Sequence, residues 1–177
     1  MQLKNPVTAK DHQQGLGSAT TTLVEYGDYQ CPSCREAYPM VKRLQEHFAD
    51  SLRLVFRHFP LTQAHPMAQP TAEAAEFAGK YGKFWEFHDH VFQQPFALSS
   101  EVLTAVAEEC ALDPSALREA VAKHTFQERV KMDFMGGVRS GVGGTPTFFI
   151  NGVQHAGPWD HDSLLAAIES SSKQAKP

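Results

Sequence analysis

The sequence has very little cysteine: Cys31, Cys34 and Cys110 are the three cysteines among 177 residues. Three thiols cannot hold a domain of this size together as a disulfide scaffold. One close pair and one distant thiol suit catalytic redox chemistry at the pair better than structural cross-linking. The sequence also lacks any run of about 18 apolar residues, which excludes a membrane-spanning helix.

The sequence has no large excess of positive or of negative side chains. Lysine and arginine number 16 against 20 aspartates and glutamates, and the formal net charge of −4 gives a nucleic-acid role no electrostatic support. Apolar residues make up 42%, enough for a proper core. Residues 1–18 are polar and lack the apolar stretch of a secretory signal peptide. A full-length chain of this kind is predicted to be cytoplasmic, and one that has lost a signal peptide is periplasmic or exported.

Two of the cysteines lie in one short stretch, GDYQCPSCR at residues 27–35. A β-branched and aromatic run at residues 22–26 comes before it, and apolar residues at helical spacing follow it to about residue 50. A C-x-x-C sequence between a strand and a helix is typical of a thioredoxin-like redox site. The stretch therefore predicts a thiol–disulfide oxidoreductase.

The spacing of the cysteines suits thiol–disulfide exchange. Cys31 stands where the helix begins, so unpaired amide N–H groups and the helix dipole favour its thiolate. Cys34, one turn further along, is placed to attack a mixed disulfide on Cys31. Pro32 fixes the first turn, and Ser33 adds a hydroxyl but no charge. We predict that Cys31 is the nucleophile and Cys34 the buried resolving thiol.

Two further positions are candidates for the site. Glu25 stands among apolar neighbours in the strand before the motif, where desolvation would raise its pKa and let it accept a proton from Cys34. The alternative is that Glu25 faces solvent on an edge strand. Pro146 precedes a strong strand; a trans bond is the default, but a cis bond would leave the backbone of Thr145 free to pair with a substrate strand.

The residues after the first helix predict a strand, a run of helices, a hairpin and a final helix, in that order. A second strand is predicted at residues 51–61, which completes a βαβ unit. Residues 64–135 almost lack strand patterns and predict five helices, at about 66–81, 83–93, 100–110, 114–123 and 125–139. A glycine-rich loop at 141–146 then leads to a strand at 147–150, an Asn151-Gly152 hairpin turn, a strand at 153–155 and a helix at 163–170.

Three stretches, LVEYGDYQCPSC, KFWEFHDHVF and GVGGTPTFFING, resemble the DsbA-like thioredoxin-fold family and occur in that family's order. The resemblance covers roughly residues 11–170. It implies that Cys31 is the reactive thiol, Cys34 its partner and Glu25 a buried acid. It also implies that Pro146 is cis and that Thr145 contacts substrate.

The fold class implied is α/β, a thioredoxin fold with an inserted helical domain. We expect residues 18–62 and 140–170 to form the thioredoxin-fold domain and residues 63–139 the helical insertion. Residues 1–17 would be an N-terminal arm with at most one edge strand, and residues 171–177 a polar, frayed tail.

The predicted function is disulfide exchange with cysteines of substrate proteins or peptides, in the oxidase or the reductase direction. A redox partner or glutathione would recycle the Cys31–Cys34 pair, and no organic cofactor or metal is expected. Pro32, Ser33, Thr145 and Pro146 are the expected substrate contacts. The best-known oxidising members of the family carry histidine where this chain has Ser33. We therefore expect a weaker oxidant, with a potential between about −120 and −270 mV.

Three alternatives stay open. A glutathione-dependent transferase or isomerase on the same fold usually lacks one cysteine of the pair. A zinc-binding module needs a second pair of ligands, which the sequence does not supply at the usual spacing. A redox-inactive binding domain would keep its activity when Cys31 is replaced by serine.

Several other residues are expected to be structural. Cys110 falls on the apolar stripe of its predicted helix and should be a buried, inert thiol. His88 and His90 point to different faces of one helix, so they do not predict a metal site. The aromatic residues of helix 83–93 are expected to pack in the core rather than to line a peptide groove that faces Cys31. The same expectation holds for Met132, Phe134 and Met135.

Overall fold

A computed structural model describes residues 1–95 and 97–174 and has a five-stranded mixed sheet at its centre. The strand order is β1-β3-β2-β4-β5. The bounds are β1 (His12–Gln14), β2 (Thr21–Gly27), β3 (Leu52–His58), β4 (Thr147–Ile150) and β5 (Val153–Gln154). Strands β2 and β3 run parallel, while β1 and β4 are antiparallel to their neighbours. The predicted α/β class is confirmed, and β2 is the central strand.

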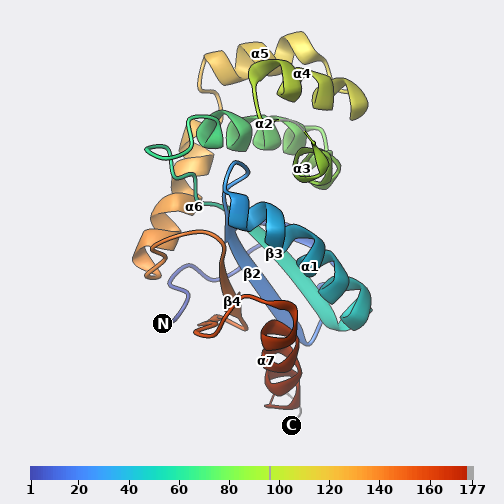
Figure 1. Cartoon of the computed structure of the whole chain (residues 1–177), viewed down its shortest axis with the longest axis vertical. Helices are drawn as coiled ribbons and strands as arrows, with labels where there is room; N and C mark the ends of the chain where they lie inside the picture. Colours follow the sequence, from blue (N-terminus) through green and yellow to red (C-terminus); the bar gives the residue numbers. More distant parts are fainter. Residues whose placement is uncertain (96, 175–177) are drawn as a thin grey trace.

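Two helices cover one face of the sheet, α1 (Pro32–Phe48) and α7 (His161–Gln174) (Figure 1). Proline at the first position of α1 suits a helix start, because the N–H group it lacks would have no partner there. The apolar positions of α1 recur at helical spacing and pack with leucines of the sheet and of α7. The buried residues of this layer include Ala37, Met40, Val41, Leu44, Leu23, Leu54 and Leu164.

The segment between β3 and β4 is helical. Helices α2 (Ala68–Lys80), α3 (Phe84–Gln93), α4 (Ser100–Glu109) and α5 (Pro114–Ala122) form a layer beyond one end of the sheet (Figure 1). Helix α6 (Gln127–Arg139) returns to the opposite face, where Phe134 stacks on Phe59 with ring centroids 4.5 Å apart. All five predicted helices are confirmed, each end within two residues of its expected place.

The N-terminal segment, residues 1–17, contacts both edges of the sheet. The expected edge strand is present as β1, but Gln2 also forms a bridge with β5 at the opposite edge. Arg57 on β3 also holds this segment, because a buried cation needs hydrogen-bond partners. Its guanidinium donates to Asp11 at 2.7 Å and to two backbone oxygens of the N-terminal segment. Burying Arg57 therefore ties this segment to the domain.

Helix α7 is longer than the predicted 163–170, and the expected frayed tail is wrong for residues 171–174. The serines that made this stretch polar are used inside the fold. Ser172 donates to the Ile168 carbonyl at 3.0 Å, and its hydroxyl lies 2.8 Å from that of Thr21 on β2. The remaining residues of the predicted tail, 175–177, lie outside the described residues.

The Asn151-Gly152 hairpin is confirmed. The φ angles are +47° at Asn151 and +81° at Gly152, the positive values that a two-residue turn of this kind requires. The helices among the described residues include none long and apolar enough to cross a membrane.

Gly27, the last residue of β2, is packed against an aromatic ring just before the cysteine motif. A Cβ atom at Gly27 would lie 2.4 and 2.7 Å from two ring atoms of Phe56, which is fully buried and cannot swing away. We expect Gly27→Ala to lower the free energy of unfolding by about 1–3 kcal/mol in urea titrations. The matched control is Gly17→Ala, because a Cβ there meets no atom within 4 Å. Equal losses in the two variants would contradict this packing argument.

Candidate active site

The fold brings the cysteine motif and the Thr145-Pro146 pair together. Cys31 is the residue that precedes α1, and its thiol lies 3.4 Å from the backbone oxygen of Thr145, 114 positions later in the chain. The Thr145–Pro146 peptide bond is cis, as predicted. Pro32 is exposed, while Ser33, Thr145 and Pro146 are half-buried. A peptide could therefore reach all four of the residues expected to contact substrate.

The two thiols of the motif have very different acidities. The pKa of Cys31 is lowered to about 5, mainly by a hydrogen bond from the Cys34 thiol. Amide N–H groups of Ser33 and Cys34 at the start of α1 contribute, and burial opposes them. Cys31 is therefore a thiolate at neutral pH.

Cys34 is the opposite case. Its side chain is 0% exposed, and burial raises its pKa far above the ordinary value of a thiol. The negative charge of Glu25 adds to the shift, whereas the N–H group of Asp28, 3.4 Å from the sulfur, reduces it. The pair thus consists of one ionised thiol that is 7% exposed and one neutral thiol that is 0% exposed.

Glu25 is buried in the central strand β2, so the alternative of a solvent-facing residue on an edge strand is wrong. Burial raises the pKa of its carboxyl to about 8. Among the described residues, Oε1 of Glu25 has no hydrogen-bond partner. A cavity of about 10 Å³, close to the size of one water, is lined by Glu25, Gln45 and their neighbours. The carboxyl is therefore protonated at neutral pH and can take part in proton transfer.

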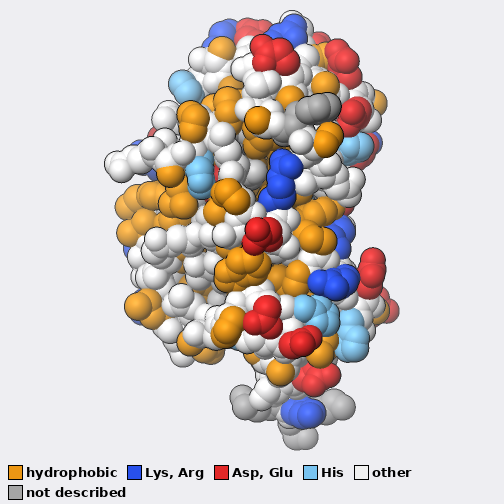
Figure 2. Space-filling view, in the orientation of Figure 1, with side chains coloured by type: hydrophobic (Ala, Val, Ile, Leu, Met, Phe, Trp, Pro, Cys, Tyr) orange, Lys and Arg blue, Asp and Glu red, His pale blue; other side chains and the backbone are white. Residues whose placement is uncertain are grey.

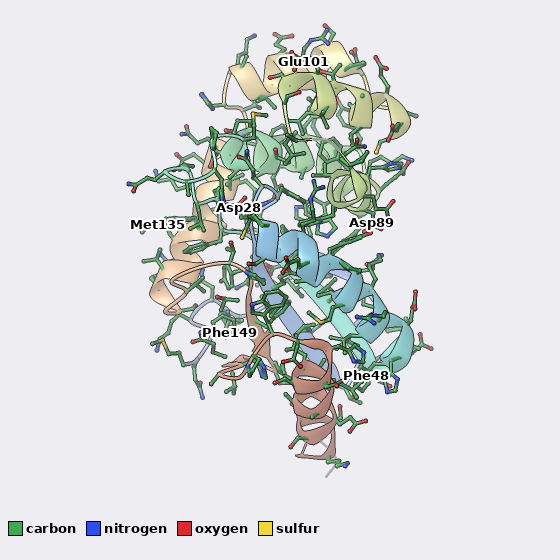
Figure 3. All side chains as sticks on the ribbon, viewed as in Figure 1. Asp28, Phe48, Asp89, Glu101, Met135 and Phe149 are labelled. Carbon is green, nitrogen blue, oxygen red and sulfur yellow. The ribbon has the colours of Figure 1, made fainter. Side chains whose placement is uncertain are left out.

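Asp28 is a site residue that sequence reasoning did not single out. Its Oδ1 accepts a hydrogen bond from the N–H group of Gln30 at 2.8 Å. Its Oδ2 accepts from the N–H group of Leu61 at 2.9 Å and lies 2.7 Å from Nδ1 of His65. Figure 3 places Asp28 at the start of α1, below the helical layer. The first bond is a local turn that aspartate favours in sequence, but the partners beyond β3 are supplied only by the fold.

The aromatic helix α3 packs in the core, as predicted, next to the cysteine motif. Phe84, Phe87 and Phe92 are buried, and Nδ1 of His88 lies 3.1 Å from the hydroxyl of Tyr29. Burial lowers the pKa of His88 well below its ordinary value, so this histidine is neutral. The helix closes the buried side of the motif next to Cys34.

The expectation that Met132 and Met135 lie in the core is wrong, since they are 60% and 41% exposed. Apolar side chains are visible in Figure 2 at the edge of the molecule where α6 lies in Figure 1, and Figure 3 labels Met135 there. Phe134, between them in sequence, faces inward onto Phe59. The outer methionines lie on the opposite side of α6 from this contact.

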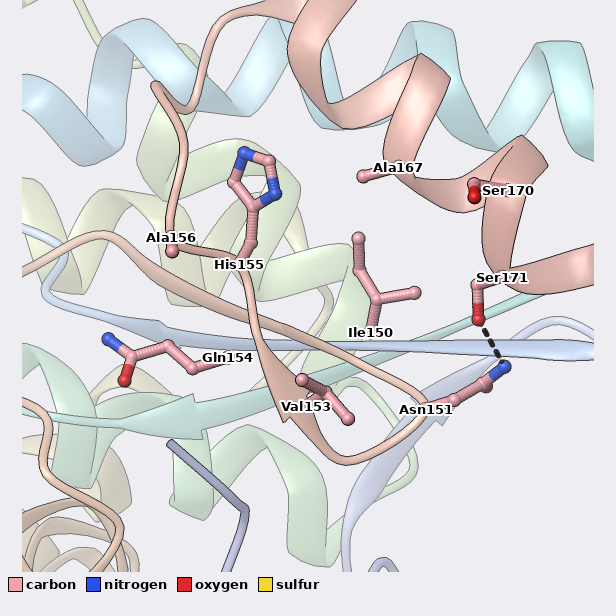
Figure 4. Close-up of a pocket in the computed structure, with 9 residues that line it drawn as sticks. All are labelled: Ile150, Asn151, Val153, Gln154, His155, Ala156, Ala167, Ser170 and Ser171. Carbon is pink, nitrogen blue, oxygen red and sulfur yellow. Dashed lines mark hydrogen bonds between the residues drawn. The ribbon is translucent and has the colours of Figure 1, made fainter. Parts of the chain in front are cut away.

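A cavity of about 570 Å³ lies away from the thiols, between the β4–β5 hairpin and α7 (Figure 4). Its lining includes Ile150, Val153, His155 and Ala167. It contains no cysteine and none of the predicted site residues. The candidate active site is therefore the surface at Cys31 and Pro146, not this cavity.

A sequence model of the family described as Thioredoxin matches residues 7–170. The chain belongs to the thioredoxin family. The match runs through the cysteine motif, the helical segment and the final hairpin, so the predicted thioredoxin fold is confirmed.

Solved structures of bacterial proteins share this fold. Oxidised BdbD from Bacillus subtilis is 26% identical, with a TM-score of 0.82, over 91% of this chain and 92% of BdbD. Alpha-DsbA1 from Wolbachia pipientis is 20% identical, with a TM-score of 0.81, over 96% of this chain and 94% of that one. The resemblance to the DsbA-like thioredoxin fold is therefore confirmed.

The curated relatives of this chain include antiporters that are much longer than the chain. The Na(+)/H(+) antiporter NhaA 1 of Salinispora arenicola is 44% identical over 161 residues, which is 91% of this chain but 24% of the antiporter. The chain spans about a quarter of the length of the curated relatives it matches. The similarity therefore concerns one region of those antiporters.

Proposed function

We propose that this thioredoxin-family chain exchanges disulfides with cysteines of substrate proteins or peptides through Cys31 and Cys34. The observation that carries the proposal is the unequal pair of thiols at the start of α1. The acidic Cys31 lies beside the cis-proline loop, and the buried Cys34 is held neutral behind it. A thiolate that both attacks and leaves readily, next to a resolving thiol, is what disulfide exchange requires.

In the oxidase direction, a substrate thiolate attacks the sulfur of Cys31 in the Cys31–Cys34 disulfide. The bond between the two cysteines breaks, a mixed disulfide forms at Cys31, and Cys34 leaves as a thiolate. A second substrate thiolate then attacks the substrate sulfur of the mixed disulfide and releases Cys31 as a thiolate. The substrate gains a disulfide, and its two electrons reduce the Cys31–Cys34 pair.

Glu25 is proposed to carry the proton of Cys34. When Cys34 leaves as a thiolate in the core, the protonated carboxyl of Glu25 is the nearby acid that can neutralise it. In the reverse direction, the carboxylate accepts the proton as Cys34 attacks the mixed disulfide. The raised pKa of Glu25, about 8, lets the carboxyl hold and release this proton near neutral pH.

The substrate peptide is proposed to lie across Pro32, Ser33, Thr145 and Pro146. The backbone groups of Thr145 would pair with an extended peptide whose cysteine faces Cys31. The reaction needs no organic cofactor, because the cysteine pair itself carries the two electrons. A redox partner protein or glutathione would recycle the pair, and an oxidase direction would suit an exported or periplasmic location.

The test compares cysteine variants with a peptide that carries two cysteines. Cys31→Ser should abolish oxidation of the reduced peptide. Cys34→Ser, mixed with the same peptide in its disulfide form, should accumulate a mixed disulfide at Cys31 that mass spectrometry detects, because the thiolate of Cys31 opens the peptide disulfide and no Cys34 thiol resolves the product. The matched control is the same peptide with serines in place of its cysteines, which should neither be oxidised nor trapped. Full activity of Cys31→Ser would overturn the proposal and favour a redox-inactive binding domain.

A further inference from the structure

A second group of reactive side chains lies in the helical layer, away from the cysteine motif. It consists of Glu86 and His90 on α3 and Cys110 at the end of α4. One possible ligand atom of each residue lies within 4.8 Å of those of the other two. We infer that these three side chains form a binding site for a zinc-type transition-metal ion.

The set of donors suits such an ion. Thiolate sulfur, imidazole nitrogen and carboxylate oxygen are the three protein ligand types that zinc takes, and three protein ligands leave a fourth position for water. Bond lengths of about 2.0–2.3 Å in a tetrahedral site put the ligand atoms about 3.5 Å apart. The donor atoms lie within 4.8 Å of one another, so side-chain rotations of the partly exposed Glu86 and His90 would bring them to that separation.

Each of the two α3 ligands is already oriented by a second residue. Nδ1 of His90 lies 2.9 Å from Oε2 of Glu109, which leaves Nε2 as the nitrogen with a free lone pair. A carboxylate that holds the other ring nitrogen is the usual outer partner of a metal-binding histidine. Oε2 of Glu86 accepts a hydrogen bond from Lys83 at 2.6 Å, which leaves Oε1 available.

The local charge favours a cation. With Cys110 as a thiolate, Glu86, Glu109 and Cys110 carry three negative charges, and Lys83 offsets one of them. A divalent ion neutralises the remaining two. On binding, Cys110 loses its thiol proton to solvent, a metal–sulfur bond forms, and no electron moves.

Access to the site is one-sided. The side chains of His90 and Glu86 are 38% and 39% exposed, so an ion can arrive from solvent. Cys110 is 0% exposed and supplies its sulfur from the protein side. The spacing of His88 and His90 does not predict this site, because His88 is not one of the ligands. The other two ligands are Glu86, four residues before His90 on α3, and Cys110 at the end of α4.

A second cluster of possible metal ligands consists of His12, His58 and Glu76, and its hydrogen bonds and ion pairs explain it without a metal. His12 and His58 each place Nε2 within 3.0 Å of Oε1 of Glu76, and the guanidinium of Arg129 lies 3.6 Å from the same oxygen. The carboxylate of Glu76 thus already has its partners, and the neighbouring Arg129 repels a cation. At the cluster of Cys110 the neighbouring cation is Lys83, which bonds Oε2 of Glu86 and leaves Oε1 of that carboxylate available.

The experiment titrates Co²⁺ into the full chain with Cys31 and Cys34 oxidised to a disulfide. Cys110 is then the remaining thiol, so a thiolate-to-cobalt absorption band in the near ultraviolet reports binding at Cys110. We expect this band, together with the visible bands of tetrahedral cobalt, and expect added Zn²⁺ to remove both. If the disulfide does not form, the Cys31→Ser/Cys34→Ser double variant serves instead, so failure of the redox proposal stays separate.

Variants assign the ligands. Cys110→Ser and His90→Ala should each lose the charge-transfer band, and Glu109→Gln should weaken zinc binding by about tenfold or more. His90 is partly exposed, so His90→Ala keeps the fold, which far-ultraviolet circular dichroism checks. His161→Ala, at another exposed histidine with an acidic partner, is the control and should bind normally. Absence of the band in the unaltered chain, or its persistence in His90→Ala, would overturn the inference.

Discussion

We expect a redox potential of roughly −220 mV for the Cys31–Cys34 pair, between those of thioredoxin and DsbA. The reason is the acidity of Cys31. Its pKa of about 5 lies between the values of about 7 for thioredoxin and about 3.5 for DsbA. At pH 7 a thiolate with this pKa stabilises the reduced pair about fiftyfold more than one with a pKa of 7. For two electrons, each tenfold is about 30 mV, so the potential rises by about 50 mV above that of thioredoxin.

The measurement is equilibration in graded glutathione buffers with the fraction of free thiol read by alkylation. A potential at or above about −180 mV would favour an oxidase or isomerase, and one near about −270 mV a reductase. A value near about −120 mV would contradict the prediction that this chain is a weaker oxidant than members with histidine between the cysteines. A pair without any reversible disulfide would contradict the proposed function itself.

Ser33→Ala and Ser33→His separate the contribution of this position. An imidazolium at residue 33 would add a positive charge beside the thiolate of Cys31, so Ser33→His should raise the potential by about 30 mV or more. Ser33→Ala removes a hydroxyl but no charge and should stay close to the unaltered chain. Equal potentials for both variants would show that charge at residue 33 does not set the acidity of Cys31.

Glu25→Gln is expected to change the pH dependence of stability strongly. The pKa of Glu25 is about 8 in the folded protein, above the ordinary value of 4.5 that holds in the unfolded chain. Between these values the folded state keeps a proton that the unfolded state releases. The contribution of Glu25 to stability is therefore complete below about pH 4.5 and falls as the pH rises toward 8.

Glutamine is neutral at every pH, so the variant lacks this loss. The difference in unfolding free energy, Glu25→Gln minus unaltered chain, should grow by about 1.4 kcal/mol per pH unit, or roughly 4 kcal/mol from pH 5 to pH 8. Urea titrations at pH 5, 6.5 and 8 measure it. Both proteins are kept in the same redox state, because Cys31 has its own pH dependence that then cancels. A difference that does not change with pH would show that Glu25 ionises normally.

The same variant tests the proposed proton transfer. Without a group that accepts the proton of Cys34, attack of Cys34 on the mixed disulfide should slow by about 100-fold or more at pH 7. The first attack of Cys31 on a disulfide should be nearly unchanged, since the thiolate of Cys31 does not depend on Glu25. Stopped-flow measurements of the two steps distinguish this result from general damage to the site, which would slow both.

Much of the site was predictable because its chemistry is local in sequence. The C-x-x-C spacing, Pro32 at the first helical position and the apolar stripe of the following helix all act within a few residues. They predict a nucleophilic Cys31 and a resolving Cys34 at the start of a helix. Family resemblance, rather than any local pattern, supplied the cis bond at Pro146, which local preferences alone place at about one in twenty.

Contacts between distant segments could not be predicted. The burial of Glu25 depends on β2 being the central strand, with β3 on one side and β4 on the other. Arg57 holds the N-terminal segment against the sheet, because a buried guanidinium needs several acceptors. Asn5, Pro6 and Asp11 supply them together with the hydroxyl of Tyr26.

The sequence by itself thus determined the elements and the reacting atoms, since helix starts, strand patterns and cysteine spacing follow from short-range geometry. The tertiary structure alone decided the environment of those atoms. It buries Cys34 and Glu25, brings Thr145 to Cys31 and places Cys110 beside His90. Desolvation and charge act through space, so their effect on acidity is fixed only when segments far apart in sequence pack together.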